Sequence, residues 1–152
     1  MEPQINAYTH RSFKRQIPRD SAPIGLDEIR SEINQVTEKI INCAYRVSNT
    51  LGSGFLEKVY ENALAIELRQ SGLKVTQQYP VNVLYHGNLV GDYIADLLIE
   101  DCVIVETKAV TALDEVHSAQ CMNYLKATGF KVCLLINFGK PRVDIRRIVL
   151  DY

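Results

Sequence analysis

Hydrophobic residues change their spacing along the chain, and these changes divide it into helices and strands. Over Leu26–Leu51 they recur every three or four residues, which is typical of an amphipathic helix. A second helix is expected over residues 54–71, because Gly52 can cap the first helix and Gly72 can stop the second. Two helices therefore precede the first predicted strand.

The second predicted helix carries an acidic side chain at the edge of its apolar face. Projection at about 100° per residue places six residues on that face: Leu56, Val59, Tyr60, Ala63, Leu64 and Leu68. Glu57 is in line with Leu64 and Leu68, so we expect its carboxylate to point toward the core side. Glu57 is also near the first turn, where an acidic side chain meets free N–H groups at a gain of about 0.3–1 kcal/mol. The two roles are compatible in one residue.

The next part of the pattern predicts strands. Residues 75–84 form a strand in which Pro80 suggests an edge position or a bulge, and His86 belongs to the turn that follows. Two apolar runs, residues 97–99 and 103–105, have the composition of strands that are covered on both faces. We expect these two runs to form a hairpin.

One further helix and two further strands complete the prediction. Residues 111–114 show a capping-box pattern that opens a helix, and Gly129 closes it. Val132–Asn137 and Asp144–Val149 are the last two strands. The predicted order of elements is ααβββαββ.

Charged residues interrupt the apolar hairpin at Asp96, Glu106 and Lys108. An isolated charge in such a place costs several kcal/mol or more unless it finds a partner or a metal. A three-residue connection, residues 100–102, built as a type I turn plus one left-handed residue, places Asp96 opposite Glu106. A two-residue connection would instead place Asp96 opposite Val105. With the longer connection, the carboxylates of Asp96 and Glu106 lie close together, and the ammonium of Lys108 follows two residues after Glu106. This arrangement suits a divalent cation beside a polarised water.

A plainer interpretation of the same residues remains open. The pattern Glu-x-Lys occurs by chance about once in every two chains of this length. Glu106 and Lys108 would then form a surface ion pair at an exposed strand end, worth about 0–1 kcal/mol. The local pattern alone does not decide between this interpretation and a metal site.

The helix after residue 111 presents a polar stripe made of His117, Gln120 and Tyr124, whose spacings of three and four place them on one line. The residues left to pack on its other sides are Val116, Ala119, Met122 and Leu125. The stripe either borders a site or is solvated, and the sequence leaves both open.

Composition narrows the functional classes. The 152 residues are 47% hydrophobic, as expected for a single globular domain over residues 26–152, and the net charge of −1 shows no global basic field. The four cysteines form no Cys-x-x-Cys pair, which favours reduced core thiols and a cytoplasmic setting. No run of 18 apolar residues and no apolar leader with a cleavage site are present, which argues against membrane insertion and secretion. Residues 1–25 hold three of the five prolines and a basic cluster, so we expect a mobile tail that either reaches a phosphate backbone or has no specific role.

Several blocks of the sequence resemble one known family. Gly54-Phe-Leu-Glu57-Lys-Val-Tyr60 is a full instance of the signature of the GxxExxY proteins, a bacterial family in the PD-(D/E)xK nuclease-like superfamily. The resemblance continues, in the same order, through Tyr93-Ile-Ala-Asp96, Val103-Ile-Val-Glu106-Thr-Lys108, His117-Ser-Ala-Gln120 with Tyr124, and Asn137-Phe-Gly139. It extends from about Thr37 to Leu150. One departure is Ser48, where the family often has a His.

The resemblance implies a restriction-endonuclease-like α/β core, in which a central mixed sheet is flanked by helices. It also implies that Asp96 and Glu106 ligate Mg²⁺ or Mn²⁺, that Glu57 completes the metal site, and that Lys108 orients or polarises the attacking water. Gln120 and Tyr124 match a Gln-x-x-x-Tyr element that some branches carry beside the site, and Tyr60 and His117 are expected to border it.

The predicted function is a metal-dependent nuclease acting on DNA or RNA by direct attack of water. The alternative is a nucleic-acid-binding or regulatory module that keeps the fold and the acidic cluster without turnover. A third possibility, a Schiff-base enzyme using Lys108, is weak because flanking carboxylates stabilise its ammonium form. The oligomeric state is left open.

Overall fold

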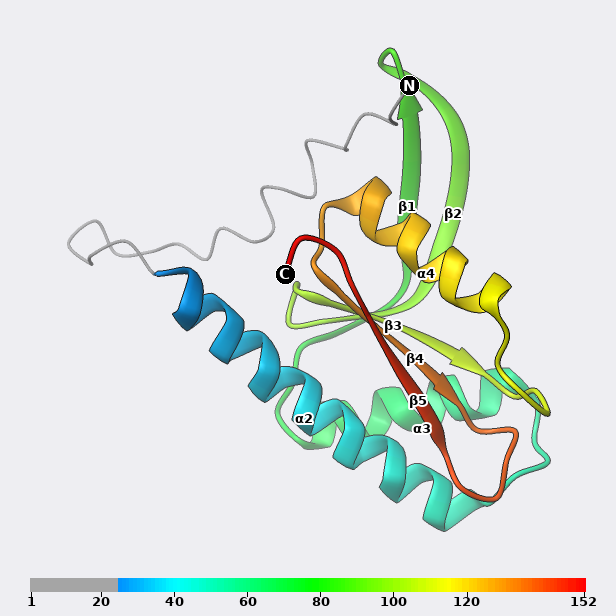
Figure 1. Cartoon of the computed structure of the whole chain (residues 1–152). Helices are drawn as coiled ribbons and strands as arrows, with labels where there is room; N and C mark the ends of the chain where they lie inside the picture. The colour runs from blue at the N-terminus through cyan, green and yellow to red at the C-terminus, as the bar shows by residue number, and fades with distance from the viewer. Residues whose placement is uncertain (1–24) are drawn as a thin grey trace.

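The structure of the chain is a computed structural model, and it describes residues 25–152. Its elements are α2 (Leu26–Leu51), α3 (Glu57–Gln70), β1 (Val75–Tyr85), β2 (Asn88–Ile99), β3 (Val103–Lys108), α4 (Glu115–Thr128), β4 (Val132–Asn137) and β5 (Asp144–Val149) (Figure 1). The order ααβββαββ is therefore confirmed. The tail expected over residues 1–25 lies, except for Gly25, outside the described residues.

The strands form one mixed sheet in the order β1-β2-β3-β4-β5. Strands β3 and β4 are parallel and joined through α4, whereas the other neighbours are antiparallel. Strand β1 lies at an edge, which is the position that Pro80 suggested, because an edge strand tolerates a residue without an N–H group. His86 occupies the β1–β2 turn, as predicted, with a left-handed φ of 47°.

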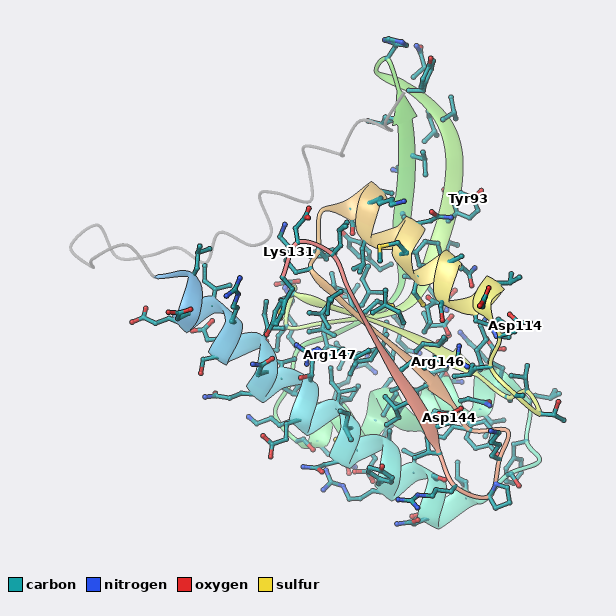
Figure 2. All side chains as sticks on the ribbon, in the orientation of Figure 1. Tyr93, Asp114, Lys131, Asp144, Arg146 and Arg147 are labelled. Atoms are coloured by element: carbon teal, nitrogen blue, oxygen red, sulfur yellow. The ribbon has the colours of Figure 1, made fainter. Side chains whose placement is uncertain are left out.

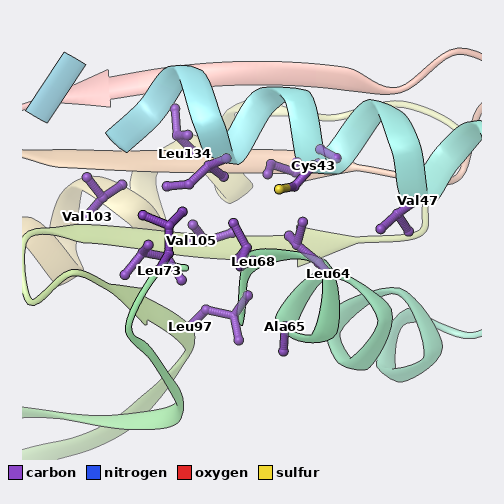
Figure 3. Close-up of a cluster of buried hydrophobic side chains, with 14 of the residues drawn as sticks. Cys43, Val47, Leu64, Ala65, Leu68, Leu73, Leu97, Val103, Val105 and Leu134 are labelled. Carbon is purple, nitrogen blue, oxygen red and sulfur yellow. The ribbon is translucent and has the colours of Figure 1, made fainter. Parts of the chain in front are cut away.

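Helices cover both faces of the sheet. Helices α2 and α3 pack on one face, where Val103 and Val105 of β3 meet Leu64 and Leu68 of α3 (Figure 3). Helix α4 packs on the other face, where Ile104 belongs to a second buried cluster. Because side chains alternate along a strand, the even-numbered residues of β3 leave the sheet toward α4. Glu106 and Lys108 are even-numbered, so alternation places them on the α4 side as well.

Helix α3 begins later than the pattern predicted, and a different set of its side chains is buried. Gly54 has a φ of 115° and Leu56 is extended, so the helix starts at Glu57 rather than at Gly54. Leu56 is 81% exposed and Val59 is also exposed, so neither belongs to the core. The buried residues of α3 are Tyr60, Glu61, Leu64, Ala65 and Leu68. The buried face is thus rotated toward Glu61 and Ala65, because the sheet, and not the strongest apolar stripe, decides which side is covered.

Helix α4 also begins later than predicted. The capping box uses Asp114 as the N-cap, not Thr111: the Asp114 carboxylate accepts from the Val116 and His117 N–H groups. The Asp114 N–H donates in return to His117 Nδ1 at 3.2 Å. Val116 and Ala119, expected to pack, are exposed, and the polar stripe lies on the buried side with Tyr124. Gly129 ends the helix in the left-handed region, as predicted.

Candidate active site

The β2–β3 hairpin has the register that the sequence predicted. Leu97 pairs with Val105 and Ile99 with Val103, so the next position along places Asp96 opposite Glu106. The connection is residues 100–102, but its turn differs from the expected type I form: Glu100 and Asp101 are both left-handed, at φ 51° and 54°. Two successive left-handed residues match the twist of a hairpin better than a type I turn does.

The paired carboxylates bond to the backbone of the facing strand. The Asp96 N–H donates to Glu106 Oε1 at 2.9 Å. In return, Asp96 Oδ2 accepts from the Thr107 N–H at 2.8 Å and from Thr107 Oγ1 at 2.7 Å. The regular ladder stops at Leu97 and Val105, and these side-chain contacts take its place where the strands separate. Thr107, a fully buried hydroxyl, was not predicted to have a role.

Burial and mutual repulsion perturb both carboxyl groups. Glu106 is only 3% exposed, and this burial, followed by the neighbouring Asp96 charge, raises its pKa to about 9. Burial also raises the pKa of Asp96, while its hydrogen bonds from Thr107 oppose the rise and the charge of Glu61 adds to it. The site therefore favours a proton or a cation beside this pair.

The oxygen donors of the pair are of the type that Mg²⁺ and Mn²⁺ prefer. The hydrogen bonds described above use Oδ2 of Asp96 and Oε1 of Glu106, which leaves the second oxygen of each group for a further partner. Within residues 25–152, however, no three His, Cys, Asp or Glu side chains are arranged as a ready metal site. The residues fit a hard cation by chemistry, and the carboxylates are held by backbone N–H groups.

Helix α3 brings Glu57 into electrostatic range of the pair. Glu57 is exposed and does not belong to the buried face of α3, so its expected direction toward the core is wrong. Partial desolvation still raises its pKa, the charge of Lys108 lowers it, and the charge of Asp96 raises it again. The Lys108 charge also lowers the pKa values of Asp96 and Glu106. One ammonium thus interacts with three carboxyl groups. That Glu57 shares a metal with the pair stays a prediction.

Glu61 is a second acidic residue of α3 near the site, and sequence reasoning missed it. It is 3% exposed and accepts hydrogen bonds from Lys58 Nζ at 2.7 Å, Gln77 Nε2 at 2.9 Å and Gln78 Nε2 at 2.8 Å. Gln78 is left-handed, at a φ of 55°, where the β1–β2 pairing skips the position of Asp96. The available signal was the spacing of Glu61, four residues after Glu57 and three before Leu64 on the same line of the helix.

Replacing Glu61 with Ala is expected to lower the free energy of unfolding by about 1–3 kcal/mol, because three donors lose a buried acceptor. Glu67→Ala on the same helix is the control, since its ion pair with Arg46 is partly exposed and is worth at most about 1 kcal/mol. Urea unfolding measures both variants. Equal losses, or a more stable Glu61→Ala protein, would contradict a stabilising role for Glu61.

Tyr124, in the polar stripe of α4, lies close to the strand that carries Asp96. Gln120 Nε2 donates to Tyr124 Oη at 3.0 Å, and Tyr124 Oη lies 3.5 Å from the carbonyl oxygen of Ile94. Burial, followed by the charge of Glu106, raises the pKa of Tyr124 to about 12, so its hydroxyl remains a neutral donor beside the pair. His117 serves the helix cap through its Nδ1, which accepts from the Asp114 N–H. That Gln120 and Lys108 border one cleft stays a prediction.

Tyr60 anchors the backbone next to the site. Its ring is fully buried and stacks on Phe138 at 4.8 Å, and its hydroxyl donates to the Gly52 carbonyl. The Phe138 N–H in turn donates to the carbonyl of Lys108 at 2.8 Å. Tyr60 therefore fixes the turn between α2 and α3 and, through Phe138, the end of β3. Direct contact of Tyr60 with a substrate stays a prediction.

A model of the PD-(D/E)XK nuclease superfamily matches residues 34–148, which is most of the chain and includes Asp96, Glu106 and Lys108. The chain belongs to the PD-(D/E)XK nuclease superfamily. Its five-stranded mixed sheet, flanked by helices on both faces, is the α/β core that the resemblance implied. The superfamily part of the sequence prediction is thus confirmed, while the GxxExxY subfamily stays a prediction.

Comparison with solved structures gave a similarity to an alkaline exonuclease, LHK-Exo, from Laribacter hongkongensis. It has 13% sequence identity and a TM-score of 0.43, and covers 78% of this chain and 82% of the exonuclease chain. A similarity of that size supports no argument about substrate or mechanism. Comparison with curated proteins gave no match. Among the described residues, no helix has the length and apolar character needed to cross a bilayer.

Proposed function

We propose that this PD-(D/E)XK protein is a nuclease that needs a divalent metal and hydrolyses phosphodiester bonds by direct attack of water. One observation carries the proposal: Asp96 and Glu106 face each other where β2 and β3 separate, with Lys108 two residues further along β3. The superfamily match covers all three residues.

Each side chain of the proposed site has its own role in hydrolysis. Asp96 and Glu106 would hold Mg²⁺ or Mn²⁺ through their remaining oxygens, with Glu57 as a third acidic partner. When bound, the metal supplies a lowered pKa for its water and stabilises charge on the phosphate. Lys108 adds a positive charge that orients the attacking water or the phosphate oxygen. Gln120 and Tyr124 contribute neutral hydrogen-bond donors on the α4 side.

A non-catalytic nucleic-acid-binding or regulatory module is the second candidate, and one observation favours it. Both carboxylates accept hydrogen bonds from backbone N–H groups of the facing strand, so they stabilise the separated strands without any metal. Such contacts would persist in a protein that had lost turnover. Only an activity measurement separates the two candidates.

The subfamily, the substrate and the compartment can be proposed from further residues. The signature from Gly54 to Tyr60 supports membership of the GxxExxY subfamily within the superfamily. The substrate would be nucleic acid, either DNA or RNA. None of the four cysteines forms a disulfide and all four are buried, which agrees with the reducing cytoplasm as the working compartment.

The test is cleavage of labelled DNA and RNA, single- and double-stranded, in Mg²⁺, Mn²⁺ or EDTA. We expect products with metal, none with EDTA, and none from Asp96→Asn, which keeps the shape of the side chain but removes its charge. Cleavage by Asp96→Asn at the wild-type rate, or cleavage in EDTA, would contradict the proposal. Absence of cleavage under every condition, combined with binding, would support the non-catalytic module.

A further inference from the structure

A groove of about 440 Å³ runs between helix α4 and the β1–β2 hairpin. Val83 and Tyr93 form its hairpin wall, and its helix wall includes Gln120, Asn123 and Tyr124. This volume is within the range of pockets that bind small organic groups. The groove thus has one aromatic wall and one wall that carries side-chain amides.

Tyr124 connects the groove to the strand that carries Asp96. Gln120 and Tyr124 line the groove, and they are hydrogen-bonded to each other. Tyr124 Oη lies 3.5 Å from the carbonyl oxygen of Ile94, which precedes Asp96 by two residues on β2. Burial, followed by the charge of Glu106, raises the pKa of Tyr124, in agreement with this position. A molecule in the groove would therefore lie next to the site proposed for hydrolysis.

Tyr93 provides an open aromatic surface on the hairpin wall. Tyr93 is 51% exposed, so much of it is open to a partner. Its ring centroid lies 6.1 Å from that of Tyr124, with the planes tilted by 51°, so the two rings are not stacked on each other. Figure 2 shows Tyr93 on β2, near the level of α4. An exposed ring of this kind stacks well on a flat partner.

We propose that this groove, the α4–hairpin groove, binds an unpaired nucleobase of the strand whose phosphate lies at Asp96 and Glu106. Tyr93 stacks on the base, and the amides of Gln120 and Asn123 contact its polar edge. Lys126, which also lines the groove and is exposed, adds a positive charge for the sugar-phosphate backbone. This inference rests on the proposed function and adds a substrate class, single-stranded or unpaired nucleic acid.

A base that is paired in a duplex cannot enter the α4–hairpin groove directly. In a duplex each base is stacked and paired, and it reaches a side pocket only after it is flipped out at a cost of a few kcal/mol. Stacking on an aromatic side chain, by contrast, is available to every base of a single strand. The groove therefore distinguishes nucleic-acid strands by whether their bases are paired.

The experiment measures binding of short fluorescent oligonucleotides by anisotropy in EDTA, so that it does not depend on cleavage. Tyr93→Ala is expected to weaken single-strand binding by about 5- to 150-fold, the equivalent of roughly 1–3 kcal/mol per stacked base. Tyr93→Phe should bind as the wild type does. Blunt duplex binding should be the same in all three proteins. DNA and RNA strands are tested in parallel.

Two controls make the result specific. Tyr85→Ala removes an exposed tyrosine from the same hairpin but outside the groove, and it should leave binding unchanged. Ala119→Phe places a bulky ring in the groove from an exposed position on α4, and it should weaken single-strand binding without disturbing the core. An abasic strand should bind the wild-type protein and Tyr93→Ala equally, because it has no base to stack.

Wild-type single-strand affinity in Tyr93→Ala and Ala119→Phe, or equal losses for duplex and single strand, would overturn the inference while leaving cleavage as a separate question. Conversely, Tyr93-dependent binding without cleavage in any metal would uphold the groove and overturn the nuclease proposal.

Discussion

Glu106→Gln is expected to stabilise the metal-free protein at alkaline pH, even though it removes a residue of the proposed active site. The pKa of Glu106 is about 9 in the folded protein, well above that of an unfolded glutamate, which is 4.5. Between these two values the folded state keeps a proton that the unfolded state releases. Stability therefore falls as pH rises, by up to about 1.4 kcal/mol per pH unit, and Gln does not titrate.

The stability difference between Glu106→Gln and wild type should grow by on the order of 3 kcal/mol from pH 5 to pH 8. Gln keeps an oxygen that can accept from the Asp96 N–H, so the hairpin contact is preserved. Urea unfolding in EDTA at the two pH values measures the effect. Glu38→Gln, at an exposed position of α2, is the control for the loss of one acidic side chain.

The same variant separates a metal ligand from a structural residue. A metal that binds only the folded state stabilises it by about 2.7 kcal/mol at a hundredfold excess over Kd. Mn²⁺ should therefore raise the melting temperature of the wild-type protein and leave that of Glu106→Gln unchanged. If the variant is less stable at both pH values and still gains the full Mn²⁺ shift, Glu106 is a structural hydrogen-bond partner and the nuclease proposal loses its central residue.

Lys108→Ala is expected to lower the rate of cleavage at saturating substrate by about 10²–10³-fold, the range seen when one group that stabilises transition-state charge is removed. The side chain interacts with Glu57, Asp96 and Glu106, so its loss leaves the acidic cluster without its ammonium. Single-turnover cleavage in saturating Mn²⁺ measures the effect, and anisotropy measures binding separately.

Lys74→Ala is the matched control for Lys108→Ala. It removes the same charge at an exposed position beside the 100–102 turn, where Lys74 pairs with Asp101 at 2.7 Å. Its cleavage rate should remain close to that of the wild type. Equal rates for Lys108→Ala and Lys74→Ala would show that Lys108 has no role in cleavage beyond that of a surface charge.

Local patterns in the sequence determined the elements and the register of the central hairpin. The bounds of α2, β4 and β5 follow from apolar spacing, because a helix and a strand each bury a face with a fixed period. The position of Asp96 opposite Glu106 follows from the number of residues in the turn, since a shift by one moves every later side chain to the other face. Both are short-range properties.

Only the tertiary structure decided how the site is held and what surrounds it. Glu61 is buried because the sheet selects one side of α3, and its partners Gln77 and Gln78 come from another element. Thr107 reaches Asp96 because β2 and β3 separate there, which no pattern within either strand reports. The α4–hairpin groove likewise depends on the distance between two elements. Each of these contacts joins residues of different elements, and periodicity, which is a property of a single element, carries no information about them.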